Sequence, residues 1–337
     1  MLKAVIIGFG GVAQAHRYAY WFHNKQGMSV QLVAACDADP AKFDTMTKIN
    51  IPLKGEIVNE LPFNKYTDWR EMLEKEKPDI VDICLPTKFH ESISIEAMKM
   101  GYNVLCEKPM ADNYTQCLNM IEVSKETGKN LMIGQCVRFY PEYEYLQSAV
   151  VDGRYGKVLS ANFHRFSPIP LWGNNAWREK AGKVGSCLFE LNIHDIDVVR
   201  WIFGDPKKVS CVLESRVYPY DFADTKMIYK DITVEVNGAW QEEDAVFNAG
   251  YDVCFEKGIL TLCDGKVVFT SNDGEKTQIE VEDSEGIMGE IKYFVGVLSG
   301  DFENTKNTPT DSSKTNYTME KLFESADKNG ETLMWSD

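Results

Sequence analysis

The chain has 337 residues, of which 44% are hydrophobic and 26% charged. At ~150 residues per domain this length predicts two domains, and the composition excludes a disordered or collagen-like chain. No apolar run approaches the ~18 residues that a membrane-spanning helix needs, and the first residues lack the pattern of a signal peptide. We therefore expect a cytoplasmic protein with no membrane partner.

The net charge and the cysteine content exclude further classes of protein. The net charge is −15, and no run of Lys or Arg indicates the basic face that nucleic-acid-binding proteins use. The nine cysteines are odd in number and form no C-x-x-C pair, so neither a disulfide framework nor a zinc ribbon is indicated. We expect no nucleic-acid partner and no metal site, and we attribute the acidity to solubility.

The first half of the chain alternates apolar strands with helices. Strands are predicted over residues 3–8, 30–36, 79–84, 103–106 and 130–134, and helices over 12–24, 40–49, 68–75, 90–100 and 113–127. Residues 50–64 contain prolines and a glycine and are predicted to be irregular. Continuously apolar strands that alternate with helices are typical of parallel βαβ units buried on both faces.

The second half is richer in strands. A strand is predicted over 157–167, a helix over 190–203, several strands between 209 and 281, and helices over 285–299 and 315–329. Lys257-Gly258 and Asp264-Gly265 indicate hairpin turns, and Asn237-Gly238 indicates a break. We predict an α/β domain over residues 1–130 and an α+β domain with an antiparallel or mixed sheet over 131–337. The helix over 315–329 is a candidate to pack back on the first domain.

A glycine-rich turn follows the first predicted strand and opens the first helix. Its sequence, Gly8-Phe9-Gly10-Gly11-Val12-Ala13, matches G-x-G-x-x-G/A. The first glycine allows a tight turn, the second lets a pyrophosphate approach the backbone, and the small sixth residue lets helix and strand pack closely. We predict that this turn binds a dinucleotide. The alternative is a turn without a ligand.

An acidic residue, Asp37, ends the second predicted strand. A carboxylate there accepts hydrogen bonds from ribose hydroxyls and repels a 2′-phosphate, so NAD is favoured over NADP. Asp37 lies somewhat beyond the usual ~20 residues from the glycines, because residues 24–29 lengthen the first connection. The alternative role is to cap the next helix.

Two further segments follow predicted strands at the edge where α/β sheets bind ligands. After the 79–84 strand, Leu85 and Pro86 turn the chain over the cofactor, and His90 either contacts a ribose or caps the next helix. After the 103–106 strand come Glu107 and Lys108, both of which we predict to contact the cofactor. An ammonium at that edge can hold a substrate hydroxyl and stabilise a developing alkoxide. An ordinary surface lysine is the alternative.

The predicted helix over 190–203 carries a third group of polar residues. Glu190 and His194 are four residues apart and share a helix face, with Asp197 as a further neighbour. Imidazole is the side chain best suited to accept a hydroxyl proton near neutral pH. His194 is therefore a candidate general base, and a structural histidine is the alternative.

These segments together resemble the Gfo/Idh/MocA family of glucose–fructose oxidoreductase and inositol dehydrogenases. The resemblance covers nearly the whole chain and is carried by Gly8–His16, Asp37, Pro86–His90, Glu107–Pro109, Gln135–Pro141, Trp177–Arg178, Glu190–Asp197 and Trp201–Gly204. It implies a Rossmann domain followed by a domain with a large open, mainly antiparallel sheet, through which a homodimer or homotetramer forms. It also implies bound NAD or NADP and a sugar or polyol substrate.

Carried over by position, Lys108 matches the active-site lysine of the family's E-K-P motif, and His194 matches its usual catalytic histidine. Many polyol dehydrogenases of the family have Asp where this chain has Glu190, so the carboxylate here reaches one methylene further. The stretch before the site helix adds three candidates for the substrate wall, with core packing as the alternative for the tryptophans. They are Arg165, Trp172 and Trp177.

The sequence thus predicts an NAD(P)-dependent oxidoreductase that moves a hydride between a CH–OH group and nicotinamide. His194 takes the hydroxyl proton, Lys108 stabilises the oxygen, and Glu190 holds a neighbouring hydroxyl or orients the histidine. Two alternatives are an NAD-dependent glycosidase that oxidises its substrate transiently and a non-catalytic regulator that binds a dinucleotide. A regulator would need neither Lys108 nor His194.

Overall fold

The computed structural model describes residues 1–44, 62–169, 182–282 and 286–336. The chain forms two compact units, each made of two separate stretches of sequence. The first unit comprises residues 1–136 and 285–316, and the second comprises residues 137–284 and 317–337. Each unit is described by itself.

The first unit contains a parallel sheet of six strands in the order β3-β2-β1-β4-β5-β6. Its strands are β1 (Leu2–Ile7), β2 (Val30–Cys36), β3 (Asn64–Tyr66), β4 (Ile80–Ile83), β5 (Asn103–Glu107) and β6 (Leu131–Gly134). Its helices are α1 (Gly11–Lys25), α2 (Trp69–Glu76), α3 (His90–Lys99), α4 (Tyr114–Thr127) and α8 (Gly286–Ser299), with short 3-10 turns η1 (Pro40–Phe43) and η2 (Thr87–Phe89). The strand order reverses between β1 and β4, which is where doubly wound sheets bind ligands.

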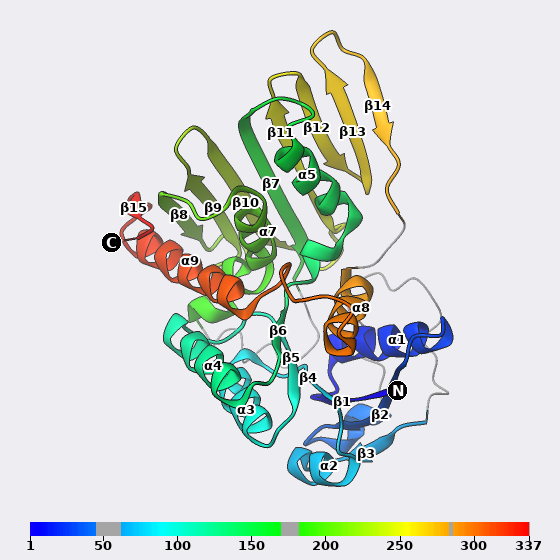
Figure 1. Ribbon diagram of the computed structural model, residues 1–337. Helices are drawn as coiled ribbons and strands as arrows, with labels where there is room; N and C mark the ends of the chain where they lie inside the picture. Colours follow the sequence, from blue (N-terminus) through cyan, green and yellow to red (C-terminus); the bar gives the residue numbers. More distant parts are fainter. Residues whose placement is uncertain (45–61, 170–181, 283–285, 337) are drawn as a thin grey trace. The chain divides into compact units, whose positions relative to one another are not determined.

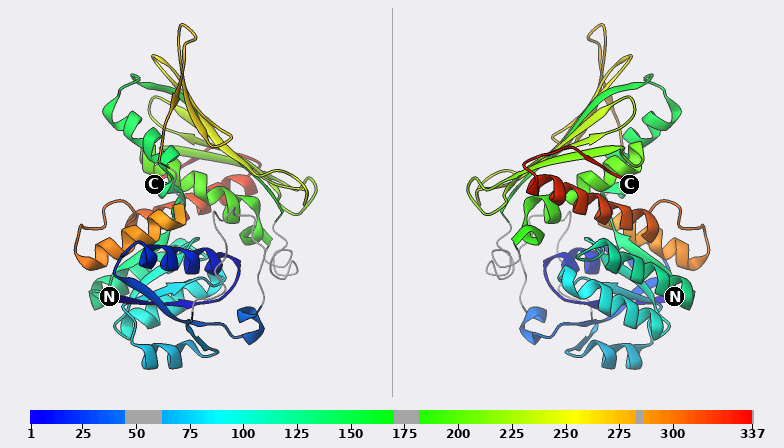
Figure 2. Two further views of the ribbon diagram at one scale, coloured as in Figure 1. Left: turned by 90° about the vertical axis from the view of Figure 1, so that its right-hand side faces the viewer. Right: turned by 90° about the vertical axis from the view of Figure 1, so that its left-hand side faces the viewer.

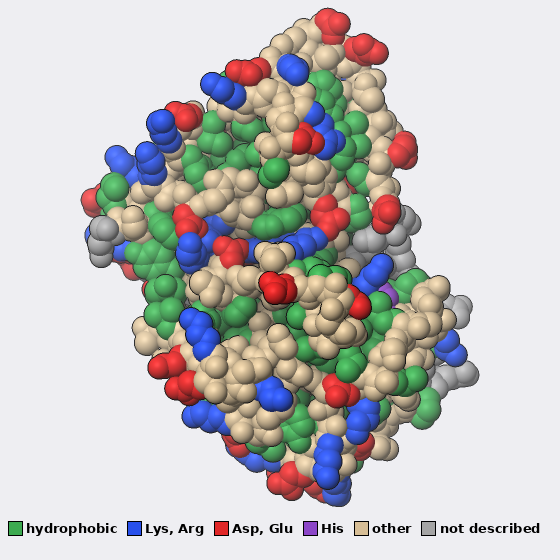
Figure 3. Space-filling model, in the orientation of Figure 1, with side chains coloured by type: hydrophobic (Ala, Val, Ile, Leu, Met, Phe, Trp, Pro, Cys, Tyr) green, Lys and Arg blue, Asp and Glu red, His purple; other side chains and the backbone are tan. Residues whose placement is uncertain are grey.

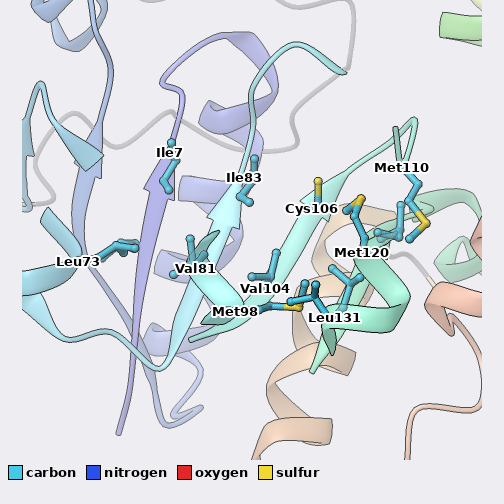
Figure 4. Packing of buried hydrophobic residues seen from close by; sticks show 14 of the residues in the cluster. Ile7, Leu73, Val81, Ile83, Met98, Val104, Cys106, Met110, Met120 and Leu131 are labelled. Atoms are coloured by element: carbon cyan, nitrogen blue, oxygen red, sulfur yellow. The ribbon is translucent and has the colours of Figure 1, made fainter. Parts of the chain in front are cut away.

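Two apolar clusters cover the two faces of this sheet. One joins alternate strand residues such as Val5, Val81 and Val104 to α2, α3 and α4, and Figure 4 shows its interior. The other joins the remaining strand residues to α1 and α8. The four central and edge strands β1, β4, β5 and β6 are buried on both faces along most of their length, which is why their sequences are mainly apolar.

The predicted elements of the first unit are largely confirmed. Asp68 caps α2 by accepting hydrogen bonds from two backbone N–H groups, Asn113 caps α4, and Gly128 ends α4 in the left-handed conformation. The helix predicted over 40–49 is described only as the short turn η1, because residues 45–61 lie outside the described part. The three-residue strand β3 was not predicted, since it begins at Asn64, the last residue of the segment expected to be irregular, and its short sequence contains no apolar run.

The second unit contains a sheet of nine strands in the order β14-β13-β12-β11-β7-β10-β9-β8-β15. The strands are β7 (Val158–Pro168), β8 (Lys208–Glu214), β9 (Phe222–Ile228), β10 (Thr233–Gln241), β11 (Asn248–Phe255), β12 (Gly258–Cys263), β13 (Lys266–Ser271), β14 (Lys276–Ile279) and β15 (Leu333–Met334). Among these described strands β7 and β10 pair in parallel and the other pairs are antiparallel. Helices α5 (Pro141–Asp152) and α7 (Ile193–Phe203) lie on one face (Figure 2).

The large, mainly antiparallel sheet confirms the fold predicted for the second half. Asp264 and Gly265 form the predicted hairpin turn, both with positive φ. Asn237-Gly238, expected as a break, lies inside β10 instead. Helix α5 was not predicted. The helix predicted over 190–203 begins as a π-helical turn, η5 (Leu188–Asn192), before α7.

The domain boundary differs from the division at residue 130. The first unit continues to Cys136 and regains residues 285–316, which the sequence assigned to the second domain. Residues 285–316 join the first unit because α8 buries apolar side chains there. Its residues Ile287, Ile291 and Phe294 belong to the cluster around α1. Helix α8 therefore belongs to the first unit, whereas α9 (Pro309–Asp327), which contains most of the helix expected to pack back on the first domain, is divided between the units after Asn316.

Charged side chains of both signs lie on the surface of the described residues (Figure 3). On the face shown in Figure 3, acidic and basic side chains are interspersed over both units. None of the described helices is long and apolar enough to span a membrane.

Candidate active site

The glycine-rich turn has the geometry that its motif requires. Gly8 has a φ of +89°, and a Cβ atom there would lie 2.6 Å from the carbonyl oxygen of Cys84. The Gly8 N–H donates to the Cys36 carbonyl at 2.8 Å. A side chain at position 8 would therefore collide with the backbone that follows β4, so the turn needs glycine.

The N-terminus of α1 is arranged to receive an anion. Its N-cap residue, Gly10, has extended backbone and offers no side-chain cap, and the first turn carries no acidic residue. A Cβ atom at Gly10 would meet nothing within 4 Å. Backbone N–H groups beside open space are what a pyrophosphate needs. The residues from Gly8 to Val12 thus fit a dinucleotide.

Asp37 is fixed against this turn. Its Oδ2 accepts the backbone N–H of Phe9 at 2.8 Å, and its Oδ1 accepts that of Asp39 at 2.9 Å. The Phe9 side chain is buried and packs against the rings of Phe43 and Phe63 at 5.0 and 5.2 Å. Phe9 therefore faces any ligand through its backbone, while each oxygen of Asp37 retains acceptor capacity for a ribose hydroxyl.

His90 connects the two loops that follow β4 and β5. The ring is fully buried, and its nitrogens lie 2.7 Å from the carbonyl oxygens of Leu85 and Pro109. Burial lowers the pKa of His90, and the two carbonyl contacts oppose that shift. Both nitrogens are engaged by backbone, so the geometry favours a structural role over the predicted ribose contact. His90 fixes the loop of Leu85 and Pro86 against the loop of Lys108.

Lys108 is the one partly exposed residue in the fully described stretch from Val104 to Ala111, and every other residue there is buried. Its neighbour Glu107 points inward. The Glu107 carboxylate lies 2.9 Å from the Nε2 atom of His16 and accepts the backbone N–H of Lys108 at 3.1 Å. The structure therefore leaves Lys108 accessible and engages the predicted cofactor ligand Glu107 inside the fold.

In the second unit, too, the candidate residues are the partly exposed ones in an otherwise buried segment. Residues 185–200 are all described, and among them Glu190 and His194 alone are not buried. Glu190 lies in the π-helical turn η5, and His194 is the second residue of α7. Single-turn π-helices occur frequently at functional sites. Glu190 and His194 are therefore the two partly exposed residues of this otherwise buried segment.

The charged neighbours of His194 are engaged elsewhere. Asp195 forms a two-point ion pair with Arg165 at 2.8 and 3.0 Å, and Asp197 forms one with Arg138 at 2.6 Å for both contacts. All four side chains are buried. Asp197 therefore serves Arg138 rather than His194, and Arg165 is neutralised by Asp195, which weakens its predicted role on the substrate. Trp172 and Trp177 lie outside the described residues.

Sequence reasoning missed two buried residues behind Lys108. The ring of His16 lies between Glu107 and Asp82, at 2.9 and 2.8 Å. The signal that could have revealed Asp82 is a charged residue inside the apolar strand Ile80–Ile83. His16 lies within the stretch that carries the family resemblance, but it had no assigned role.

The comparisons with known proteins agree with this geometry. Residues 2–135 match the family described as "Oxidoreductase family, NAD-binding Rossmann fold", and residues 143–261 match the "GFO/IDH/MocA C-terminal domain". The chain belongs to the Gfo/Idh/MocA oxidoreductase family. It is therefore an oxidoreductase with an NAD-binding Rossmann domain, as the sequence predicted.

The relatives of this Gfo/Idh/MocA chain align with different fractions of its length. The D-glucoside 3-dehydrogenase of Escherichia coli is 25% identical over 89% of this chain and 88% of its own length. The 2,7-anhydro-N-acetylneuraminate hydratase of Mediterraneibacter gnavus is 30% identical over 47% of this chain and 43% of its own. An NAD-binding oxidoreductase from Klebsiella pneumoniae has the same fold, with a TM-score of 0.82, 18% identity, and 100% and 99% of the two chains covered.

Proposed function

We propose that this oxidoreductase is a dehydrogenase that transfers hydride between a CH–OH group of a sugar or polyol and NAD. One observation carries the proposal. In two otherwise buried segments, the accessible residues are those that the reaction requires, Lys108 in the first and Glu190 with His194 in the second. The D-glucoside 3-dehydrogenase that matches most of the chain supports the substrate class.

The cofactor half of the proposal rests on the first unit. The backbone from Gly8 to Val12 would hold the pyrophosphate of a bound dinucleotide, and Asp37 would accept hydrogen bonds from its ribose hydroxyls. A 2′-phosphate beside the Asp37 carboxylate would be repelled, which favours NAD over NADP. Leu85 and Pro86 line the turn after β4, and Glu107 contributes by fixing Lys108.

The chemistry of the residues follows from their charge and acidity. Nicotinamide, when bound, supplies the hydride acceptor at its C4 atom. In the second unit, His194 accepts the proton of a substrate hydroxyl. In the first unit, Lys108 donates a hydrogen bond to a substrate oxygen on which negative charge develops. Glu190 accepts a hydrogen bond from an adjacent hydroxyl, and its extra methylene suits a substrate that sits further from the helix. The proton and the hydride leave together, so the CH–OH group becomes a carbonyl.

Two alternatives receive less support. A glycosidase with transient oxidation would return the hydride to its substrate, whereas the D-glucoside 3-dehydrogenase, which matches 89% of this chain, is named a dehydrogenase. A regulator that only senses a dinucleotide gains nothing from an accessible lysine and histidine in otherwise buried segments.

Location and assembly belong to the same proposal. All nine cysteines are free, and eight of them are shielded from solvent to some degree. Such thiols suit a reducing compartment, and we propose the cytoplasm. We also propose a homodimer or homotetramer that forms through the open face of the nine-stranded sheet.

The decisive experiment is a substrate panel with a lysine variant. Sugars, inositols and sugar acids are offered with NAD⁺ and with NADP⁺, and the reduced cofactor is followed by its absorbance. We expect turnover with at least one neutral polyol or sugar and a preference for NAD⁺. Lys108→Ala should abolish turnover while NADH still binds, because the lysine contacts the reacting oxygen and not the dinucleotide phosphates.

The matched control is Lys99→Ala, which removes an exposed lysine of the same unit at the end of α3. This variant should keep full activity. Full activity of Lys108→Ala would contradict the assignment of Lys108, and a silent panel would favour the glycosidase and regulator alternatives.

A further inference from the structure

A buried ionic cluster lies directly behind Lys108 in the first unit. The Nδ1 atom of His16 is 2.8 Å from an oxygen of Asp82, and the Nε2 atom is 2.9 Å from an oxygen of Glu107. His16 and Asp82 are fully buried, and Glu107 is 6% exposed. One imidazole ring thus bridges the strands β4 and β5 near their carboxyl ends.

The surroundings are built around this bridge. The hydroxyl of Tyr20 donates to the same oxygen of Asp82 at 3.0 Å. A Cβ atom at Gly134 on β6 would lie 3.0 Å from the Glu107 oxygen that faces His16, so glycine makes room for the carboxylate. The other oxygen of Glu107 accepts the backbone N–H of Lys108 at 3.1 Å. An unbroken chain of contacts therefore runs from Asp82 through the ring to the Lys108 backbone.

The groups that face the ring determine its charge. A neutral imidazole has one N–H, so it cannot donate to two ionised carboxylates at once, whereas an imidazolium can. The Sγ atom of Cys84 and a carboxylate oxygen of Glu290 on α8 also lie within 4.8 Å of a ring nitrogen of His16. Burial is the largest single influence and lowers the pKa of His16, but the charges of Asp82 and Cys84 and the hydrogen bonds to both together outweigh it and raise the pKa well above its usual value.

Hydrogen bonding explains the cluster better than a metal ion. The ring belongs to two groups of potential metal ligands, one with Asp82 and Cys84 and one with Glu107 and Glu290. Ligand atoms around a tetrahedral zinc ion are about 3.3 Å apart. The contacts of 2.8 and 2.9 Å are shorter, and each matches a charge-assisted hydrogen bond.

We propose that His16 is a permanent imidazolium that acts as a positioning residue, holding Glu107 and through it the backbone of Lys108 in the reactive arrangement. The inference rests on the proposed role of Lys108. His16 itself touches neither substrate nor cofactor.

The first test compares two histidines on the same helix. His23 is also on α1 and nearly buried, but its ring contacts the backbone carbonyl of Met288 and no carboxylate. We expect His16→Gln to lower kcat by about 10- to 100-fold, because a small displacement of a catalytic group costs this much. The Kd of NADH, measured by fluorescence, should change less than about threefold by the same geometric argument. His23→Gln should leave kcat unchanged.

The second test asks whether His16 acts through Glu107. Groups that work as one unit give non-additive effects. The double variant His16→Gln/Glu107→Gln should therefore have the same kcat as Glu107→Gln alone. If the fold-loss of kcat in the double variant instead equals the product of the fold-losses in the two single variants, His16 acts by a route other than Glu107, and the inference is overturned.

The third test does not need a folded variant. In the wild-type enzyme labelled with ¹⁵N-histidine, both ring nitrogens of His16 should carry protons at pH 8, giving two similar shifts in place of the widely separated pair of a neutral ring. A neutral ring would overturn the inference. So would a kcat in His16→Gln equal to that of His23→Gln while Lys108→Ala is inactive. Full activity in Lys108→Ala would remove the proposed function and this inference together.

Discussion

Two buried ion pairs hold the residues beside His194 in the second unit. Arg165 with Asp195 and Arg138 with Asp197 fix the helix that carries His194. A buried ion pair adds little net stability, but removal of one partner leaves an uncompensated charge and costs about 3–5 kcal/mol. These pairs therefore fix geometry more than they add to stability.

The charge of His16 predicts a pH dependence of stability. Its pKa is raised in the folded state, so its contribution is complete below the unfolded pKa of about 6.5 and is lost as pH rises through the folded pKa. Between these two values the stability of the wild type relative to His16→Gln should fall by about 1.4 kcal/mol per pH unit. Urea unfolding of both proteins from pH 6 to 9, without cofactor, measures this difference. A constant difference across that range would contradict it.

At this scale the sequence offers candidates for the chemistry more readily than it reveals the contacts that hold them. Lys108 and Asp37 could be proposed because each follows a predicted strand. The inward turn of Glu107 and the pairing of Arg165 with Asp195 were not, because both depend on partners that are 91 and 30 residues away. A linear pattern does not contain such contacts.

At the scale of elements, the π-helical turn η5 depends on a glycine in a neighbouring strand. The backbone of Gly238 in β10 faces the side chain of Asn192, the last residue of η5. Asn192 in turn donates to Asp195 at 3.1 Å. Gly238 therefore lies inside a strand for a packing reason, which explains why its dipeptide wrongly suggested a break.

Gly238→Ala should disturb this turn. Its Cβ would lie 2.5 Å from the Oδ1 atom of Asn192, and overpacking of this kind costs about 1–3 kcal/mol. We expect a lower melting temperature and a loss of kcat by about tenfold, since η5 carries Glu190 and leads into His194. The control is Asn192→Ala/Gly238→Ala, in which the clash is absent. The double variant should recover most of the melting temperature that Gly238→Ala loses. If it does not, the loss in Gly238→Ala has a cause other than the clash with Asn192.

The elements that the sequence predicted well share a clear signal. Apolar runs in β1, β2, β4, β5 and β6, and capping residues at α2 and α4, specify structure locally. The π-helical turn was not predictable, because it depends on the contact of Asn192 with another strand. Helix α5 was missed although Pro141 occupies its first turn, since its tyrosines blur the helical pattern.

At the scale of the whole molecule, the nine-stranded sheet and the negative charge make opposing contributions to assembly. One face of the sheet carries helices, and the opposite face mixes polar residues such as Asn162 with exposed apolar ones such as Val212 and Ile259. A mixed surface of this kind is typical of interfaces between folded chains. The charge of −15 per chain works against association.

Assembly should therefore respond to a charge on the sheet and to salt. We expect light scattering to show a dimer or tetramer that Ile259→Lys converts to a smaller species. Higher salt should strengthen the wild-type assembly, because it screens repulsion between acidic chains. A wild-type monomer at every salt concentration would contradict the proposed assembly.

The divided first unit also affects how the chain folds during synthesis. Helix α8 completes an apolar cluster whose other members are made before residue 137. At a ribosomal rate of ~5–20 residues per second, residues 137–284 take about 7–30 s to follow. During this interval the docking surface of α8 on the nascent Rossmann half stays uncovered, and we expect chaperones that bind exposed apolar surfaces to shield it until the end of the chain emerges.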